Sequence, residues 1–382
     1  MRYKLKVLSP VHIGTGTRLS SLDGAYFRGR WYRISLDKVL RAVPDQALLS
    51  DALGSRDFSW ETWLRGNLPG APLEDLSSYS LKSPALEGRY ELREAVKTPA
   101  LKPYIPGSSV KGAIRTALLW RMAKDDPSKL ISSLRVRGSD RRERADDTVE
   151  AAFLGGDPHY DILRALRVRD SSCEELERME VGLVWVYTLR DGRLERKVEE
   201  GREHKTFVEW LTDDAELEMD ISVDEDLLSS PLGERLGFAG RAELVRGFAE
   251  VCNDYAREII SRELEFYSSY GGEEFRPIAA FYQELEVPED GFLLNIGWGG
   301  GWETKTLGGL LEEVLGEDGF RKLRTKYSLG RNPRTRRIDL DAPFPKTRRI
   351  AYDLRGPYWP LGWVRLSTSG SAESPGVDND RV

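Results

Sequence analysis

The alternation of hydrophobic and polar residues predicts that the chain opens with β structure. In residues 2–7, Arg and Lys alternate with Tyr, Leu and Val, which is the period of a half-buried strand. A glycine-containing turn follows at 10–16, and two short runs, 25–27 and 31–34, predict a hairpin. Ser35 is placed to cap the helix after it.

The clearest predicted helix covers residues 108–124. Its apolar residues recur at intervals of three and four, as on one buried helix face: Val110, Ala113, Ile114, Ala117, Leu118 and Met122. A Pro-Gly pair before the helix predicts a turn, and Ser108 or Ser109 is the expected N-cap. Residues 44–90 are broken by prolines and support no element boundaries.

The second half of the chain repeats the order of strand, glycine turn and helix. Period-two patterns predict strands at 181–189 and 216–222, and a long amphipathic stripe predicts a helix at 241–267. A further strand at 292–296 leads into a glycine-rich turn and another helix.

This repeated order predicts the domain organisation. Mixed strands and helices indicate an α+β fold, and their recurrence indicates two similar domains packed together. We place these domains at residues 1–170 and 180–366. Residues 367–382 are polar and contain Gly, Pro and Ser, so we expect a disordered tail.

The charge balance limits which partners the surface as a whole can attract. The 382 residues include 57 Lys and Arg against 63 Asp and Glu, a net charge of −6. This excludes a general polycationic coat but leaves room for a locally basic groove. Two cysteines exclude a four-cysteine zinc ribbon and a disulfide-stapled secreted domain. Without a signal peptide or an apolar run of bilayer length, we expect a cytoplasmic protein with no membrane contact.

A first candidate site is the turn and helix start at residues 104–115. Free N–H groups and the positive end of the helix dipole favour an anion there. Lys111 and Arg115 are four residues apart and project from one side of the helix. The candidate contacts are Ser108, Ser109, Lys111, Gly112 and Arg115. The alternative interpretation is a surface helix with two solvated cations.

A second candidate site is the loop at residues 297–302, Gly-Trp-Gly-Gly-Gly-Trp. Such dense glycine lets a backbone approach a ligand closely, and two tryptophans can stack on unpaired bases. We expect Lys305 in the first turn of the following helix. The candidate contacts are Gly297, Trp298, Gly299, Gly300, Gly301, Trp302 and Lys305. The alternative is a tight turn with core tryptophans.

A third candidate site is the basic segment 321–349. It carries eleven Lys and Arg side chains against two Asp, so a polyanion would bind here within an otherwise acidic chain. The expected phosphate contacts are Arg331, Arg334, Arg336, Arg337, Lys346, Arg348 and Arg349. The alternative is a basic stretch that is merely solvated.

His12 lies in the first glycine turn with Gly14 and Gly16, and all three are candidate RNA contacts. A histidine there could be a general base for RNA cleavage, but no second acid or base lies near it in sequence. A structural or base-contacting role is therefore favoured. His159 and His204 lack partners at metal-ligand spacing. We expect no catalytic residues, no metal and no cofactor.

Three glycine-rich stretches together resemble the RAMP superfamily of CRISPR proteins. They are residues 10–16, 105–115 and 297–302. The resemblance implies two RRM-like (ferredoxin-like) domains with helical insertions. Three further stretches are similar to the fifth subunit of type III-A Csm effector complexes within that superfamily. They are Thr304-Lys-Thr306, Phe344-Pro-Lys-Thr-Arg-Arg349 and Pro360-Leu-Gly-Trp-Val364.

This resemblance implies antiviral crRNA binding without catalysis. Such a subunit caps one end of the crRNA-bearing filament, near the 3′ end of the guide, and supports crRNA maturation. The implied partners are single-stranded crRNA and other Csm subunits, especially the repeated backbone RAMP subunit and the small helical subunit. Two alternatives stay open: a RAMP endoribonuclease that cuts crRNA precursors with His12 as base, and a non-catalytic type III-B subunit.

Overall fold

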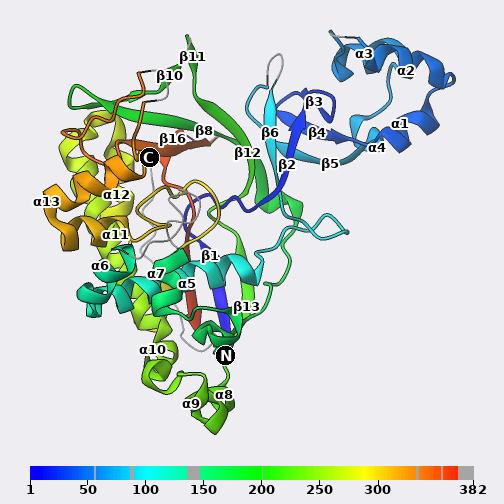
Figure 1. Cartoon of the computed structure of the whole chain (residues 1–382). Coiled ribbons are helices and arrows are strands. Elements are labelled where there is room, and N and C mark those ends of the chain that lie inside the picture. Colours follow the sequence, from blue (N-terminus) through cyan, green and yellow to red (C-terminus); the bar gives the residue numbers. More distant parts are fainter. Residues whose placement is uncertain are drawn as a thin grey trace.

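The computed structural model describes residues 1–55, 57–86, 90–135, 147–199, 201–332, 335–353 and 356–368. Its mixed helices and sheets form an α+β fold, which confirms the predicted class (Figure 1). Arg334 and most of the predicted tail, residues 369–382, lie outside the described residues. Ser367 and Thr368 were also assigned to that tail, and this is wrong because both pair in a strand of the first sheet.

A five-stranded antiparallel sheet lies inside the body of the molecule. Its order is β14 (Gly291–Asn295), β17 (Trp363–Thr368), β1 (Arg2–Val7), β13 (Glu216–Val223) and β7 (Leu166–Val168). The alternation predicted for β1 turns Tyr3, Leu5 and Val7 into the core. Helices α5 (Gly107–Asp125) and α11 (Phe248–Tyr270) pack against each other and against this sheet.

A ten-stranded sheet continues from the body into the upper right of Figure 1. Its main path is β2 (Gly14–Ser20), β6 (Glu91–Ala95), β12 (Lys205–Leu211), β8 (Met179–Arg190), β5 (Ser77–Lys82), β4 (Arg30–Ile34) and β3 (Gly24–Phe27). Strand β8 also pairs with β9 (Arg193–Arg196) and β15 (Thr347–Asp353), and β15 pairs with β16 (Gly356–Trp359). A separate small hairpin joins β10 (Val198–Glu199) to β11 (Arg202–Glu203).

Both large sheets take strands from each side of the boundary predicted near residues 170–180. In the first sheet, β1 lies between β13 and β17, and in the second sheet β12 lies between β6 and β8. The proposed division at this boundary is therefore not a division between sheets. It stays a prediction about the duplicated units.

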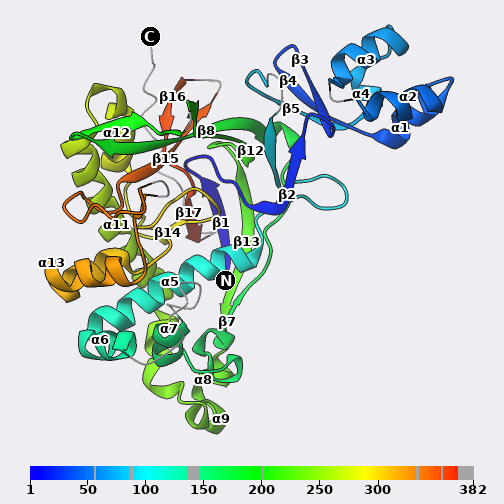
Figure 2. The ribbon, with the colours of Figure 1, turned by 45° about the horizontal axis from the view of Figure 1, so that its top comes forward.

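A helical insertion projects from the body beside the β3–β4 hairpin (Figures 1 and 2). It comprises α1 (Leu36–Ala42), α2 (Gln46–Leu53), α3 (Trp60–Asn67) and α4 (Leu73–Leu76). Its own small core contains Val39, Leu49 and Trp60. The hydroxyl of Ser35 accepts a hydrogen bond from the backbone N–H of Lys38, so the predicted cap of α1 is confirmed.

Two helix starts differ from the predictions. Helix α5 begins at Gly107 and has no side-chain cap, so Ser108 and Ser109 lie inside its first turn instead of capping it. The predicted helix 241–267 consists of α10 (Ala242–Arg246) and α11, which are separated at Gly247. The other α-helices are α6 (Pro127–Arg135), α7 (Asp147–Phe153), α8 (Glu225–Ser229), α9 (Pro231–Arg235), α12 (Arg276–Glu284) and α13 (Gly308–Lys326). Among the described helices, none is long and apolar enough to cross a membrane.

Candidate nucleic-acid interface

The glycine-rich loop after β14 packs directly against the first glycine turn. The backbone N–H of Trp298 donates to the carbonyl of His12 over 2.8 Å. Gly297 has a φ of +71°, and a Cβ there would lie 2.4 Å from the same carbonyl oxygen, so the close approach requires glycine. The carbonyl of Gly362 accepts a hydrogen bond over 2.7 Å from the backbone N–H of Ile296, the residue before the loop. The loop, the first turn and the Pro360–Val364 stretch are thus brought together.

Polar side chains hold this loop in shape from within. Asn295 Nδ2 donates to the carbonyl of Leu361 over 2.7 Å, and Lys305 Nζ donates to the carbonyl of Asn295 over 2.8 Å. A Cβ on Gly300 would lie 2.1 Å from Asn295 Oδ1. The prediction that Lys305 lies in a first helical turn is wrong, because α13 begins only at Gly308. Lys305 binds the loop backbone.

Trp298 lies over the second sheet, and two arginine side chains stack on its ring. Its indole packs on an apolar cluster on that sheet: Val184, Val208, Trp210, Ala351 and Leu361. The guanidinium carbon of Arg93 on β6 lies 4.8 Å from the centre of the Trp298 ring, and that of Arg349 on β15 lies 5.1 Å from it. Within the described ranges, neither arginine has an acidic partner.

Trp302, at the other end of the loop, packs into the protein. Its ring meets Phe344 edge-on at 5.2 Å between centres, and a Cβ on Gly308 would lie 1.7 Å from its Nε1. The interpretation as a tight turn with a packed tryptophan therefore describes Trp302 well.

His12 is buried and held in one orientation. Its Nδ1 lies 2.7 Å from the carbonyl oxygen of Glu209, which can only accept, so Nδ1 carries the proton. Burial lowers the pKa of His12 to about 4, and the charges of Arg93 and Lys97 also lower it, against the opposing effect of the Glu209 hydrogen bond. The imidazole is therefore neutral at pH 7. Its ring contacts Trp298 edge-on.

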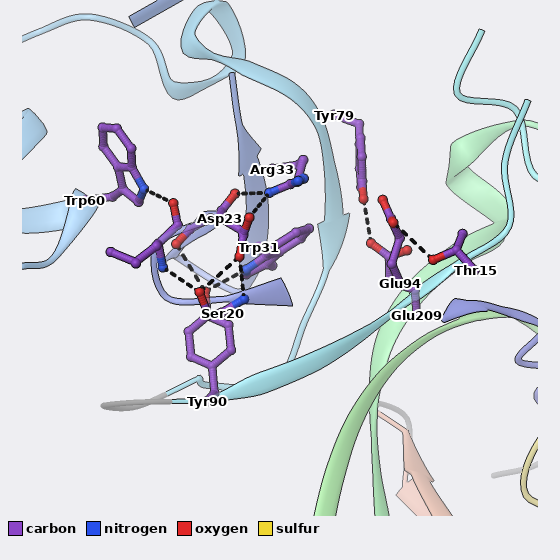
Figure 3. A network of polar contacts seen from close by, with 12 residues as sticks. Thr15, Ser20, Asp23, Trp31, Arg33, Trp60, Tyr79, Tyr90, Glu94 and Glu209 are labelled. Carbon is purple, nitrogen blue, oxygen red and sulfur yellow. Dashed lines mark hydrogen bonds and ion pairs between the residues drawn. The ribbon is translucent and has the colours of Figure 1, made fainter. Parts of the chain in front are cut away.

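The fully buried carboxylate of Glu209 lies next to the hydroxyl of Tyr79 (Figure 3). It accepts hydrogen bonds from Tyr79 Oη at 2.7 Å, from the backbone N–H of Ala95 at 2.9 Å and from Lys97 Nζ at 2.5 Å. These contacts tie β12 to β5 and β6 across the second sheet. Because both carboxylate oxygens are used and water is excluded, we assign this network to the scaffold that fixes Arg93 and the first turn.

At the start of α5, the predicted anion contacts are taken up by carboxylates of the chain itself. Arg115 pairs with Asp161 at 2.5 Å and with Glu150 at 2.6 Å. The N–H of Gly107 donates to Asp170 Oδ1 over 2.8 Å, which explains why no serine caps the helix. The guanidinium of Arg115 is thus engaged by carboxylates of the chain itself, and its role as a phosphate partner stays a prediction. Lys111 remains half-buried beside this cluster.

The basic segment contains cations that form ion pairs and cations for which the described residues provide no acidic partner. Arg348 pairs with Glu263 at 2.9 Å and lies 3.7 Å from the centre of the Phe266 ring, so it is structural rather than a free phosphate contact. Other cations of the segment are exposed or half-buried at the surface. They are Arg331, Arg336, Arg337 and Lys346.

Two neighbouring clefts connect these cations to the glycine-rich loop. The larger, about 760 Å³, is lined by the loop, Lys305 and Arg349. The smaller, about 630 Å³, is lined by Arg331 and Lys346. They share Gly330, Phe344, Pro345 and Thr347 as lining residues, so they form one groove. Burial raises the pKa of Glu303 in the larger cleft to about 7.

Arg93 is the functional candidate that the sequence did not indicate. It lies in β6, in a region without a recognisable motif, and the same strand contains two glutamates. Only the pairing of β6 with β12 brings it to Trp298. No group of three or more His, Cys, Asp or Glu placed to hold a metal occurs in the described part of the chain.

Comparisons with known proteins extend these observations. The sequence matches the model of the RAMP superfamily over residues 4–304. It is 23% identical over 390 residues to the CRISPR system Cms protein Csm5 of Methanocaldococcus jannaschii, covering 96% of this chain and 88% of that protein. It is 24% identical over 207 residues to the protein of the same name from Streptococcus thermophilus, covering 50% of this chain and 57% of that one.

Solved structures show the same similarity in three dimensions. A chain of the cryo-EM structure of a Csm–crRNA–target RNA ternary complex from a type III-A CRISPR-Cas system matches with a TM-score of 0.74 and 26% identity. That match covers 96% of this chain and 100% of the other. The crystal structure of T. onnurineus Csm5 matches with a TM-score of 0.64 and 23% identity, over 94% of this chain and 99% of that one.

Proposed function

Because this chain belongs to the RAMP superfamily, we propose that it is the crRNA-binding Csm5-type subunit of a type III-A CRISPR effector complex. The observation that carries this proposal is the match to a chain of an assembled Csm–crRNA–target RNA complex over the whole length of that chain. The two curated relatives named Csm5 support the same subunit type.

The RNA is bound through its backbone in the groove beside the glycine-rich loop. This groove offers exposed cations at Arg331 and Arg349 and the half-buried Lys346, and Arg93 lies on the ring of Trp298, which lines the larger cleft. Contacts to phosphate position an RNA without reading its sequence, which suits a subunit that must accept many guides. Glycine at positions 297 and 300 keeps the loop backbone close to its neighbours and leaves the groove open.

We further propose that the subunit does not cleave RNA. Cleavage needs a base for the 2′-hydroxyl proton and an acid for the leaving oxygen, or metal ions in their place. His12, the histidine that the sequence suggested as a base, is buried, and its pKa of about 4 makes it a weak base. His204, which lines the larger cleft, is paired with Glu199 at 2.8 Å. This favours the non-catalytic subunit over the endoribonuclease.

The position in the complex follows from the same proposal. The subunit caps the filament near the 3′ end of the crRNA, contacts the repeated backbone RAMP subunit and the small helical subunit, and supports crRNA maturation. A cytoplasmic complex of this kind needs no cofactor from this chain.

The test is co-purification followed by RNA sequencing. The tagged full chain is expressed with the other Csm subunits and a CRISPR array, and it should bring down both the subunits and crRNA. Ultraviolet crosslinks to the chain should concentrate at the crRNA 3′ end, and omission of the chain should leave that end open to a 3′ exonuclease. Recovery of the chain without Csm subunits would overturn the proposal.

A cleavage assay tests the absence of catalysis. The purified chain is incubated with crRNA precursor and with guide-matched target RNA, with and without Mg²⁺ or Mn²⁺, and we expect no specific product. Cleavage that disappears in His12→Ala would establish the endoribonuclease instead.

A further inference from the structure

Arg93, Trp298 and Arg349 come from distant parts of the chain and meet on one face of the second sheet. Arg93 lies opposite Val208 in the β6–β12 pair, and Val208 belongs to the apolar cluster under Trp298. Arg349 lies two residues before Ala351, another member of this cluster, and therefore on the same face of β15. The sheet thus sets one arginine on each of two strands separated by β12 and β8, and the indole lies over the cluster between these strands.

Among the residues that the structure describes, no carboxylate pairs with either guanidinium group. The Nε of Arg93 is buried and has no hydrogen-bond partner in the described part of the protein. Desolvation and the positive charge of Arg93 lower the pKa of Arg349, and no carboxylate offsets them. By contrast, the neighbouring Arg348 is neutralised by Glu263 at 2.9 Å.

Such an arrangement is unfavourable in the absence of an anion. Like charges held near one another repel, and a buried N–H without an acceptor loses the hydrogen bond that it makes to water in the unfolded chain. The repulsion is relieved by one ligand class, an oxyanion that accepts from the N–H groups at the guanidinium edges. A guanidinium that lies on an aromatic ring still presents its N–H edge outward, which is the geometry for bidentate contact with phosphate.

We propose that Arg93 and Arg349 form a site for the phosphodiester groups of single-stranded RNA, and that Trp298 is the positioning residue that holds both guanidinium groups. This rests on the proposed RNA-binding function. It differs from the interpretation of Trp298 as a stacking platform for a base: the ring is used by the two arginines, and the bases of the RNA face away from it.

The test separates a positioning tryptophan from a stacking one by salt dependence. The full chain is titrated with fluorescently labelled poly-uridine RNA at several KCl concentrations. Arg93→Gln and Arg349→Gln should each weaken binding about tenfold. Each should also reduce the slope of log affinity against log salt by about 0.7, the value for one contact to a single strand. Trp298→Ala removes no charge, yet it should reduce the slope by a similar amount because the guanidinium groups lose their support.

Two further variants guard the interpretation. Trp298→Phe keeps an aromatic surface and should retain the wild-type slope, even if Trp298→Ala folds poorly. Arg65→Gln changes the net charge equally on the projecting insertion and should bind like the wild type. If Trp298→Ala weakens binding with an unchanged slope, the ring stacks on bases and the proposal is overturned.

Failure of this inference is distinct from failure of the proposed function. If the wild type binds poly-uridine and co-purifies with Csm subunits, but Arg93→Gln and Arg349→Gln bind as Arg65→Gln does, only the assignment of this site is wrong. If the wild type binds no RNA and recovers no crRNA, the proposed function falls, and this site falls with it.

Discussion

The start of α5 and the loop between β14 and α13 both place glycine beside a pair of cations, but the two pairs differ in origin and in their partners. Lys111 and Arg115 are neighbours on one helix, whereas Arg93 and Arg349 reach the loop from two distant strands. At α5, Arg115 is neutralised by Glu150 and Asp161, and Asp170 accepts from the first free N–H group. At the loop, Arg93 and Arg349 share the Trp298 ring without an acidic partner among the described residues.

This difference shows that a cation motif alone does not identify an anion site, because carboxylates elsewhere in the chain can neutralise the cations. Whether its charge is available depends on carboxylates that lie 35, 46 and 63 residues away at α5. Cations that pair with carboxylates stabilise the fold, whereas cations without such partners are available to bind an anionic ligand. Substitutions at the two places should therefore separate into effects on folding and effects on RNA affinity.

The largest effect is expected on the loop side, in the acid stability of His12. Its pKa is about 4 in the folded chain against 6.5 when unfolded, so below pH 6.5 the unfolded state binds a proton that the native state does not. This contribution is complete above pH 6.5 and is lost as the pH falls to 4, by about 3 kcal/mol in total. The groups that face the ring are Arg93, Lys97 and Glu209, and the first two disfavour the imidazolium.

Urea unfolding at pH values from 7 to 4 measures this effect. The free energy of unfolding of the wild type should fall by about 3 kcal/mol more than that of His12→Asn. His159→Asn, at an exposed position near the α5 cluster, is the matched control and should follow the wild type. Parallel curves for the wild type and His12→Asn would contradict the burial of a neutral imidazole.

The next largest effect compares one glycine from each site. Gly300→Ala places a Cβ 2.1 Å from Asn295 Oδ1 and 2.4 Å from Thr304 Oγ1, so the loop must shift, at a cost of about 2 kcal/mol. Gly112→Ala in α5 meets no atom within 4 Å and should stabilise the helix by up to about 1 kcal/mol. Thermal unfolding measures both, and RNA affinity should fall only for Gly300→Ala. Equal effects of the two changes would show that the loop is not tightly fitted.

A third prediction tests the paired cations directly. Arg115→Gln leaves Glu150 and Asp161 without their partner, and because these side chains are partly exposed we expect a loss of about 1–2 kcal/mol in unfolding free energy. RNA affinity should stay within about twofold, since the local carboxylates already neutralise this charge. Arg349→Gln is the converse control, with unchanged stability and weaker RNA binding. If Arg349→Gln lowers the unfolding free energy and leaves RNA affinity normal, Arg349 is the structural cation and the assignment of the two arginines is wrong.

The sequence predicts an element well when residues close together in the chain determine its conformation. Strand β1 and the stripe of α5 follow from alternation and from three-and-four spacing, which neighbouring residues decide alone. The predicted serine cap of α5 was wrong because the N–H at the start of the helix donates to Asp170 instead. The predicted position of Lys305 in a helix was wrong because Lys305 binds the carbonyl of Asn295 in the segment before α13 starts. Neither cause is visible within a window of sequence.

The candidate site was predictable as a set of glycine turns and cations but not as a geometry. The stretches around residues 12, 298 and 362 meet in the fold, a contact that the sequence analysis did not predict. Arg93 could not be found because its role arises only when β6 pairs with β12 beneath Trp298. Arg348 and Arg349 are neighbours in sequence, yet alternation along β15 sends one to Glu263 and the other to Trp298.

The smallest effect is expected at Lys111, whose charge lies beside the ion pairs of Arg115. This position tests whether the start of α5, unlike the glycine-rich loop, is closed to RNA. Burial lowers the pKa of Lys111, the nearby negative charge of Asp161 raises it, and the positive charge of Arg115 lowers it. Asp161 therefore offsets part of the positive charge at this position. We therefore expect Lys111→Gln to change poly-uridine affinity by less than about twofold and to leave the salt slope unchanged, because no phosphate contact is lost. Arg349→Gln, measured in parallel, should lower both. A drop in slope of about 0.7 for Lys111→Gln would mean that RNA also reaches the start of α5, and that internal pairing of Arg115 does not close that site to phosphate.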